Sequence, residues 1–141
     1  MNDADGLRVE RCVACHKDSP RVTAVEQAEL LSAIPGWVVV REGDVARLRR
    51  VFPFGAYRQA LAFTQRVGEI ADVEDHHPVV LTEARRVTVT WWTHAIGGLH
   101  RNDFIMSAKT GTVFEEVVAG ERETEKLVEQ TAEIVVGDCP R

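Results

Sequence analysis

The chain has 141 residues, 45% of them hydrophobic and 28% charged, which predicts one soluble globular domain with a single core. Its net charge of −5 argues against nucleic-acid binding, which usually needs a basic face, and no apolar run is long enough to predict a membrane span. Three cysteines and an N-terminus without the features of a secretory signal predict a cytoplasmic protein.

The first part of the chain predicts a flexible leader. Residues 1–21 are polar, show no periodicity and end in Ser19-Pro20. A helix is expected to begin after Thr23, because its hydroxyl can cap a helix and Glu26 follows three residues later. Pro35-Gly36 is expected to end that helix.

Two β-hairpins with a long helix between them are expected next. Residues 42–44 and 83–86 are turn-like, and segments that read as strands flank each turn. Between the hairpins, Ala60, Phe63 and Val67 recur at helical spacing, which puts them on one face. The predicted strands are 37–40, 45–52, 79–81 and 87–94, and the predicted helix is 55–74.

After the second hairpin the pattern becomes helical again. Asn102 is placed to cap a helix that runs through Ala108, a further amphipathic helix is expected over 121–135, and 137–141 is expected to be a frayed tail. Strands that come in hairpin pairs predict an α+β fold, a four-stranded antiparallel sheet with helices packed on one face. The expected organisation is therefore a leader at 1–21, one domain at 22–112, and a C-terminal helical extension or tail at 113–141.

The histidines give the strongest functional signal. Four of the five lie between positions 76 and 100, and histidine exchanges protons near neutral pH. His76 and His77 precede the first strand of the second hairpin and His94 ends its second strand, so the hairpin brings all three to one edge of the sheet. Such a cluster favours either a metal site or metal-free general acid–base catalysis.

The motifs around these histidines resemble a known family. The chain carries Glu74-Asp-His-His-Pro78, Val87-Thr-Val-Thr-Trp-Trp-Thr-His94, and Gly97-Gly-Leu99 followed by Asp103-Phe104. Together they resemble the pterin-4a-carbinolamine dehydratase family. Ile34-Pro-Gly-Trp37 and the segment 52–63 agree with the same pattern, so the resemblance spans residues 22–110. The Cys-x-x-Cys leader and the Trp-Trp pair are similar to the bacterial members.

The resemblance implies an enzyme that removes water from 4a-hydroxytetrahydropterin and yields quinonoid dihydropterin, a step in recycling the tetrahydropterin cofactor of aromatic amino-acid hydroxylases. It implies no metal and no cofactor in the dehydratase itself. It also implies a homodimer or homotetramer, and functional coupling to an aromatic amino-acid hydroxylase. No nucleic acid or membrane is expected as a partner.

The family's site residues carry over onto this chain by motif. His76 and His94 would be the principal acid–base pair, and His77 would help to hold the ring and hydroxyl. Further residues that would line the pterin pocket or orient a histidine are Asp75, Trp92, Thr93, Ala95, Asp103 and Trp37. Trp37 could instead be simple core, and Asp103 could stabilise a helix N-terminus. His100 is expected to be a solvated loop residue.

The leader and the function each leave an alternative open. Cys12-Val-Ala-Cys15-His16 matches a haem-attachment pattern. We do not expect haem attachment, because no export signal is recognised and the residues around the motif are charged. Metal binding by the leader stays an alternative to a dispensable flexible segment. The rival function is a dehydratase-like assembly or oligomerisation factor, and the retention of all three histidines favours the enzyme.

Overall fold

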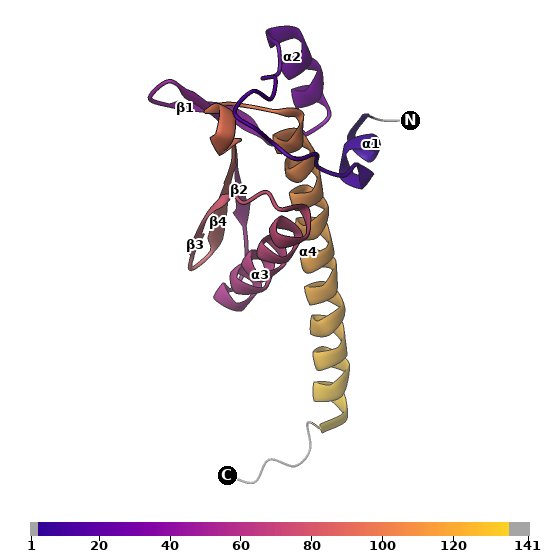
Figure 1. Ribbon diagram of the computed structural model, residues 1–141. Coiled ribbons are helices and arrows are strands. Elements are labelled where there is room, and N and C mark those ends of the chain that lie inside the picture. Colours follow the sequence, from indigo (N-terminus) through magenta and orange to yellow (C-terminus); the bar gives the residue numbers. More distant parts are fainter. Residues whose placement is uncertain (1–2, 136–141) are drawn as a thin grey trace.

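The computed structural model describes residues 3–135, so the tail expected at 137–141 lies outside the described residues. The elements in chain order are α1 (Asp3–Val9), α2 (Ala24–Ser32), β1 (Val38–Glu42), β2 (Val45–Pro53), α3 (Tyr57–Glu74), β3 (Val79–Glu83), β4 (Arg86–Trp91), the 3-10 turn η1 (His94–Ile96) and α4 (Arg101–Val135). Figure 1 shows α3 and α4 together on one side of the sheet. Within the described residues, no helix is long and apolar enough to cross a bilayer.

The strands form one antiparallel sheet in the order β1-β2-β4-β3, so the predicted α+β fold is confirmed. Each predicted hairpin is present, and the β2–β4 pairing, in which Leu48 lies opposite Trp91, joins the two. Leu48, Val87, Val89 and Trp91 are fully buried, because alternate residues of these central strands face the helices.

The core lies between this face of the sheet and the two long helices. Phe52 packs against Phe63 and Phe114 with ring centroids 4.8 and 5.1 Å apart. The helix α3 buries Ala60, Phe63 and Val67 on one face, as the helical spacing predicted, and Ala71 is buried with them. Each fully buried aromatic or aliphatic side chain of this kind contributes about 1.5–3 kcal/mol, so the aromatic cluster fixes α3 and α4 against the sheet.

The last helix differs from the expectation of two separate helices. A single helix, α4, runs from Arg101 to Val135, because no proline interrupts it and its first half buries Met106, Val113 and Val117 on the domain. Its second half extends beyond the domain (Figure 1), and Leu127 there is 63% exposed.

The leader also differs from the expectation, because it is packed onto the domain. The helix α1 contacts α4, and Leu7 is only 2% exposed. Arg11 forms an ion pair with Glu74, whose side chain is 5% exposed (Nε–Oε1, 2.9 Å), and the backbone of Val13 is hydrogen-bonded twice to the Asn102 side chain. One leucine among polar residues gives no periodic signal, so the sequence could not reveal this docking. The boundaries at 21/22 and 112/113 stay a prediction.

Candidate active site

The first candidate residues lie at the open end of the β3–β4 hairpin, where β3 begins and β4 ends. Val79 lies opposite Thr90 in an antiparallel register, so the residues just before β3 lie beside the residues just after β4. Asp75 ends α3 in a left-handed conformation (φ 49°), which turns the chain sharply towards the sheet. His76 and Thr93 thereby reach the same partner, Asp103 in the first turn of α4.

Asp103 is the centre of a buried hydrogen-bond network. Its Oδ1 lies 2.7 Å from His76 Nε2, and its Oδ2 accepts from the Thr93 hydroxyl at 2.8 Å and from the His100 backbone N–H at 2.9 Å. The carboxyl group is fully buried, and His76 is 8% exposed. Because a carboxylate only accepts, His76 donates from Nε2, and this fixes the proton of the neutral ring on that nitrogen.

The His76 ring is held from a second direction by Trp91. The two rings are stacked, with centroids 5.6 Å apart and planes within 5° of each other. Trp91 is itself fixed, because its indole N–H donates to the Thr110 hydroxyl at 3.1 Å. No residue of the described chain 3–135 forms a hydrogen bond with His76 Nδ1, so this nitrogen is available as a proton acceptor.

The other two candidate histidines are exposed. His77 Nε2 lies 3.0 Å from Asp72 Oδ1, with the two side chains 57% and 82% exposed. His94 begins η1 and its ring centroid lies 4.3 Å from that of Trp92. Trp92 is 8% exposed, with the guanidinium carbon of Arg47 3.8 Å from its ring centroid. Asp75 and Ala95, which flank these histidines in sequence, are both exposed.

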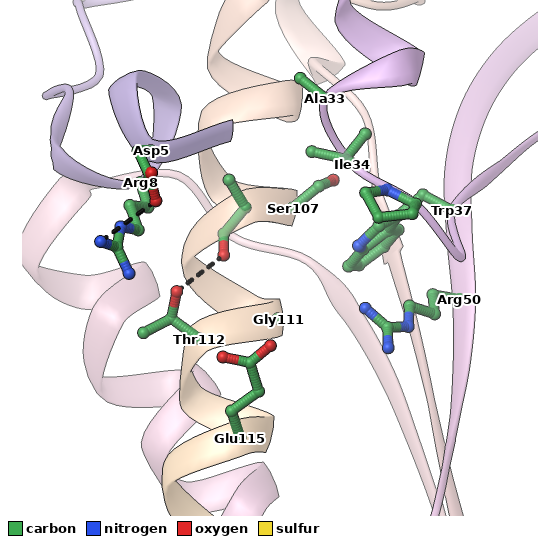
Figure 2. A pocket seen from close by; sticks show the side chains of 12 residues that line it. Asp5, Arg8, Ala33, Ile34, Trp37, Arg50, Ser107, Gly111, Thr112 and Glu115 are labelled. Atoms are coloured by element: carbon green, nitrogen blue, oxygen red, sulfur yellow. Dashed lines mark hydrogen bonds and ion pairs between the residues drawn. The ribbon is translucent and has the colours of Figure 1, made fainter. Parts of the chain in front are cut away.

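Trp37 lies apart from this network. It is 6% exposed and packs edge-to-face on Phe52, with centroids 5.8 Å apart. It lines a cavity together with Arg50 and residues of α4, shown in Figure 2, and none of the candidate histidines lines that cavity. Its predicted place in the pterin pocket therefore stays a prediction, whereas its place beside the aromatic core is direct.

His100 is buried at 8% exposure, so the expectation of a solvated loop residue was wrong. Its Nδ1 accepts the backbone N–H of Asn102 at 3.0 Å, and its own N–H donates to Asp103. The imidazole thus caps α4 in the role usually taken by serine or threonine. Burial lowers the pKa of His100, and the nearby His76 adds to this effect while Asp103 opposes it. The sequence does contain a signal for this cap, because Asp103 follows His100 by three residues, which is the spacing of a capping box.

The leader runs past the same network. The side-chain amide of Asn102 donates to Cys15 Sγ at 2.9 Å, and the Cys12 N–H donates to Glu74 at 3.1 Å. Burial raises the pKa of Cys12 to about 12, with Glu74 adding to the rise, so its thiol stays protonated near neutral pH. Within the described part of the chain, no three His, Cys, Asp or Glu side chains are arranged to hold a metal ion.

An arginine of the leader also supports the turn that carries His94. Both Nε and Nη2 of Arg21 donate to the Ile96 carbonyl, at 3.0 and 2.5 Å. The backbone N–H of Val22 donates to the Leu99 carbonyl at 3.0 Å. The segment before α2 thus braces the turn between β4 and α4.

Residues 20–113 match the family model described as pterin 4 alpha carbinolamine dehydratase. A Gloeobacter violaceus protein, provisionally assigned as pterin-4-alpha-carbinolamine dehydratase 1, is 53% identical over 80% of this chain and 97% of its own length. The chain belongs to the pterin 4 alpha carbinolamine dehydratase family. A Nitrosococcus oceani protein with the same provisional assignment is 49% identical over 75% of this chain and 94% of its own.

A solved structure of this family supports the same assignment. The crystal structure of a transcriptional coactivator/pterin dehydratase from Brucella melitensis superimposes with a TM-score of 0.62 at 31% identity. The match covers 67% of this chain and 98% of that one. The family model spans the candidate histidines, Asp103 and Trp37, and it ends within α4.

Proposed function

We propose that this chain is a cytoplasmic hydro-lyase that dehydrates 4a-hydroxytetrahydropterin to quinonoid dihydropterin, with His76, His77 and His94 as its acid–base and substrate-holding groups. The observation that carries the proposal is the arrangement of His76. Its Nε2 is bound to the buried Asp103 carboxylate and its Nδ1 has no hydrogen-bond partner within residues 3–135. Membership of the dehydratase family supports the same reaction.

The reaction requires two proton movements and no change of oxidation state. The C4a–O bond breaks and the hydroxyl leaves as water, which needs a proton from an acid. The N5–H bond gives up its proton to a base, and its electron pair forms the C4a=N5 double bond. One imidazolium and one neutral imidazole can supply both steps, and each well-placed proton transfer is typically worth about 10²–10⁴ in rate.

The proposed roles follow the exposure and partners of each group. His76 accepts or gives a proton through Nδ1 while Asp103 fixes its tautomer. His94 is the second member of the pair, since it is exposed beside Trp92 and free to meet a substrate at the surface. His77 holds the ring and hydroxyl. The remaining substrate contacts that we propose are Asp75, Trp92, Thr93 and Ala95, with Trp37 retained as a candidate.

The test is stopped-flow absorbance of chemically generated 4a-hydroxytetrahydropterin with chelator present, for the wild type, His76→Ala, His94→Ala and the control His16→Ala. His16 is an exposed leader histidine, so its removal should leave the rate unchanged. Fast wild-type turnover that falls by about 10²–10⁴ in the two site variants supports the proposal. A wild type no faster than buffer overturns it and favours the assembly-factor function. Light scattering tests the proposed homodimer or homotetramer, and adding an aromatic amino-acid hydroxylase tests the coupling.

A further inference from the structure

A cavity separate from the histidine network lies between α4, β2 and the turn that follows α2. Its volume is about 200 Å³, and Ile34, Pro35 and Trp37 form an apolar wall on one side. Figure 2 shows Ser107, Gly111 and Glu115 of α4 facing this wall and Arg50 of β2 below Trp37. Pockets for drug-sized ligands usually measure about 300–1,000 Å³, so this cavity suits a smaller molecule.

Arg50 lies at this cavity between two aromatic rings and two glycines. Its guanidinium carbon lies 4.4 Å from the Phe52 ring centroid and 5.8 Å from that of Phe114. A Cβ on Gly36, which has φ +91°, would lie 2.9 Å from Arg50 Nε, and one on Gly111 would lie 3.5 Å from Nη1. The two glycines therefore leave the room that the guanidinium occupies.

The hydrogen-bond donors of Arg50 are unused. Within residues 3–135, its guanidinium has no hydrogen bond and no ion pair within 4.0 Å. Burial lowers the pKa of Arg50, and Glu115 opposes this effect. A half-buried guanidinium that is fixed in place and has no anionic partner is suited to bind a carboxylate, which it can contact through two parallel N–H groups.

Glu115 supplies the opposite charge at the same cavity. Ser107, Gly111 and Glu115 recur every four residues along α4, so they form one stripe of the helix that lines the cavity. Glu115 acts on Arg50 electrostatically but lies beyond ion-pair distance. A separated cation and anion, with an apolar wall nearby, match a molecule that itself carries both charges on a small apolar body.

We propose that this cavity binds a small zwitterion of the α-amino-acid class, with its carboxylate on Arg50, its ammonium near Glu115 and its apolar side chain against Trp37 and Ile34. This inference does not depend on the dehydratase activity, because none of the candidate histidines lines the cavity and Trp37 is the only proposed substrate contact that does. The ligand's two charges are complementary to the two side chains, so each charge should contribute to affinity separately.

The probes are L-leucine, 4-methylpentanoate and isoamylamine, which share a branched apolar body and differ in their charged groups. Binding to the full-length protein is followed by ¹H–¹⁵N NMR, through the backbone amides of Gly36 and Gly111 and the Trp37 indole. We expect L-leucine to bind with a dissociation constant of about 1 mM or lower, and each one-charge analogue to bind about tenfold more weakly. The amide of Asp103 should not shift.

Three variants assign the charges. Arg50→Gln should weaken leucine binding about tenfold or more, while Arg58→Gln, an exposed arginine of α3, should leave it unchanged. Glu115→Gln should reduce leucine to the affinity of 4-methylpentanoate without altering 4-methylpentanoate itself. Arg50→Lys, which keeps the charge, serves if circular dichroism shows that Arg50→Gln has lost structure, and it should bind with intermediate affinity.

Two outcomes overturn the proposal. The first is the absence of any leucine response at about ten times the expected dissociation constant, which would leave Arg50 as a cover for Phe52 and Phe114. The second is leucine binding that Arg50→Gln does not weaken, or isoamylamine binding as tightly as leucine, since neither result can come from a carboxylate on Arg50.

Discussion

The substitution Asp103→Asn tests the hydrogen-bond network most directly. It keeps the shape of the side chain but makes one of its two terminal atoms a donor. Oδ2 accepts from both Thr93 and His100, whereas Oδ1 has only His76 Nε2 at 2.7 Å. The amide oxygen should therefore stay with the two donors, so that its NH₂ group faces His76.

The expected effects on stability and on kcat follow from placing an NH₂ group where a carboxylate oxygen faced His76. If His76 keeps its proton on Nε2, two donors face each other in a fully buried position, which costs about 1.5–3 kcal/mol of the free energy of unfolding. If the ring changes tautomer, Nε2 accepts the new N–H and the proton moves to Nδ1. The nitrogen proposed as the proton acceptor is then blocked, and kcat should fall by about 10²–10⁴.

Three measurements separate these outcomes. Stopped-flow absorbance gives kcat, urea denaturation gives the free energy of unfolding, and ¹⁵N-resolved NMR of the ring nitrogens identifies the tautomer of His76. The control is Asp72→Asn, which changes an 82% exposed carboxylate beside His77 and should have little effect on stability. A variant with the proton on Nδ1 and wild-type kcat would refute the role of Nδ1.

Three further predictions concern the surroundings of the site. The pKa of His100 is lowered, so as pH falls through the ordinary histidine pKa of 6.5 the unfolded chain takes up a proton that the folded chain resists, and the free energy of unfolding should decline. In urea denaturation at several pH values, His100→Ser should remove that part of the decline. A pH profile that is the same in the variant and the wild type would contradict the role of His100 as a neutral cap. Glu74→Gln should lower the free energy of unfolding by about 1–3 kcal/mol. It should also speed amide hydrogen exchange at Cys12, because the Glu74 carboxylate is bound to the Cys12 N–H and to Arg11. If the Cys12 amide stays as protected from exchange as in the wild type, the leader is not docked through Glu74. Arg21→Gln should loosen the turn that carries His94 and lower kcat/KM about tenfold, because one or two hydrogen bonds to the Ile96 carbonyl are lost. Arg58→Gln is the control. A kcat/KM for Arg21→Gln equal to that of the wild type would contradict this prediction.

The hairpins and α3 could be predicted because their signals are local. Period-two segments around polar turns give strands whose partners are adjacent in sequence, and Phe63 and Val67 recur on one face of a helix. The family motifs indicated only that Asp103 could orient a histidine, and in the structure its hydrogen-bonded histidine is His76. A separation of 27 residues carries no periodic signal that could place two side chains within hydrogen-bond distance.

The features that differ from the sequence-based expectations also depend on contacts between distant parts of the chain. The docking of Leu7 and the ion pair of Arg11 with Glu74 depend on contacts across more than 60 residues, which no local pattern contains. His100 reads as a loop residue in sequence, yet it is buried at the start of α4, where its ring accepts the Asn102 backbone N–H and its own N–H donates to Asp103. The two helices expected after Asn102 are one, since burial of Met106 and Val113 outweighs the cost of a glycine at position 111.

The amino-acid sequence by itself determined the order of α2, the two hairpins and α3, the α+β class and the family, because each depends on spacing along the chain. Only the tertiary structure decided which histidine is buried on a carboxylate, which are exposed, and that Trp37 lies with Arg50 at a separate cavity. Those properties depend on which side chains from distant segments exclude water from one another, and that is fixed by packing.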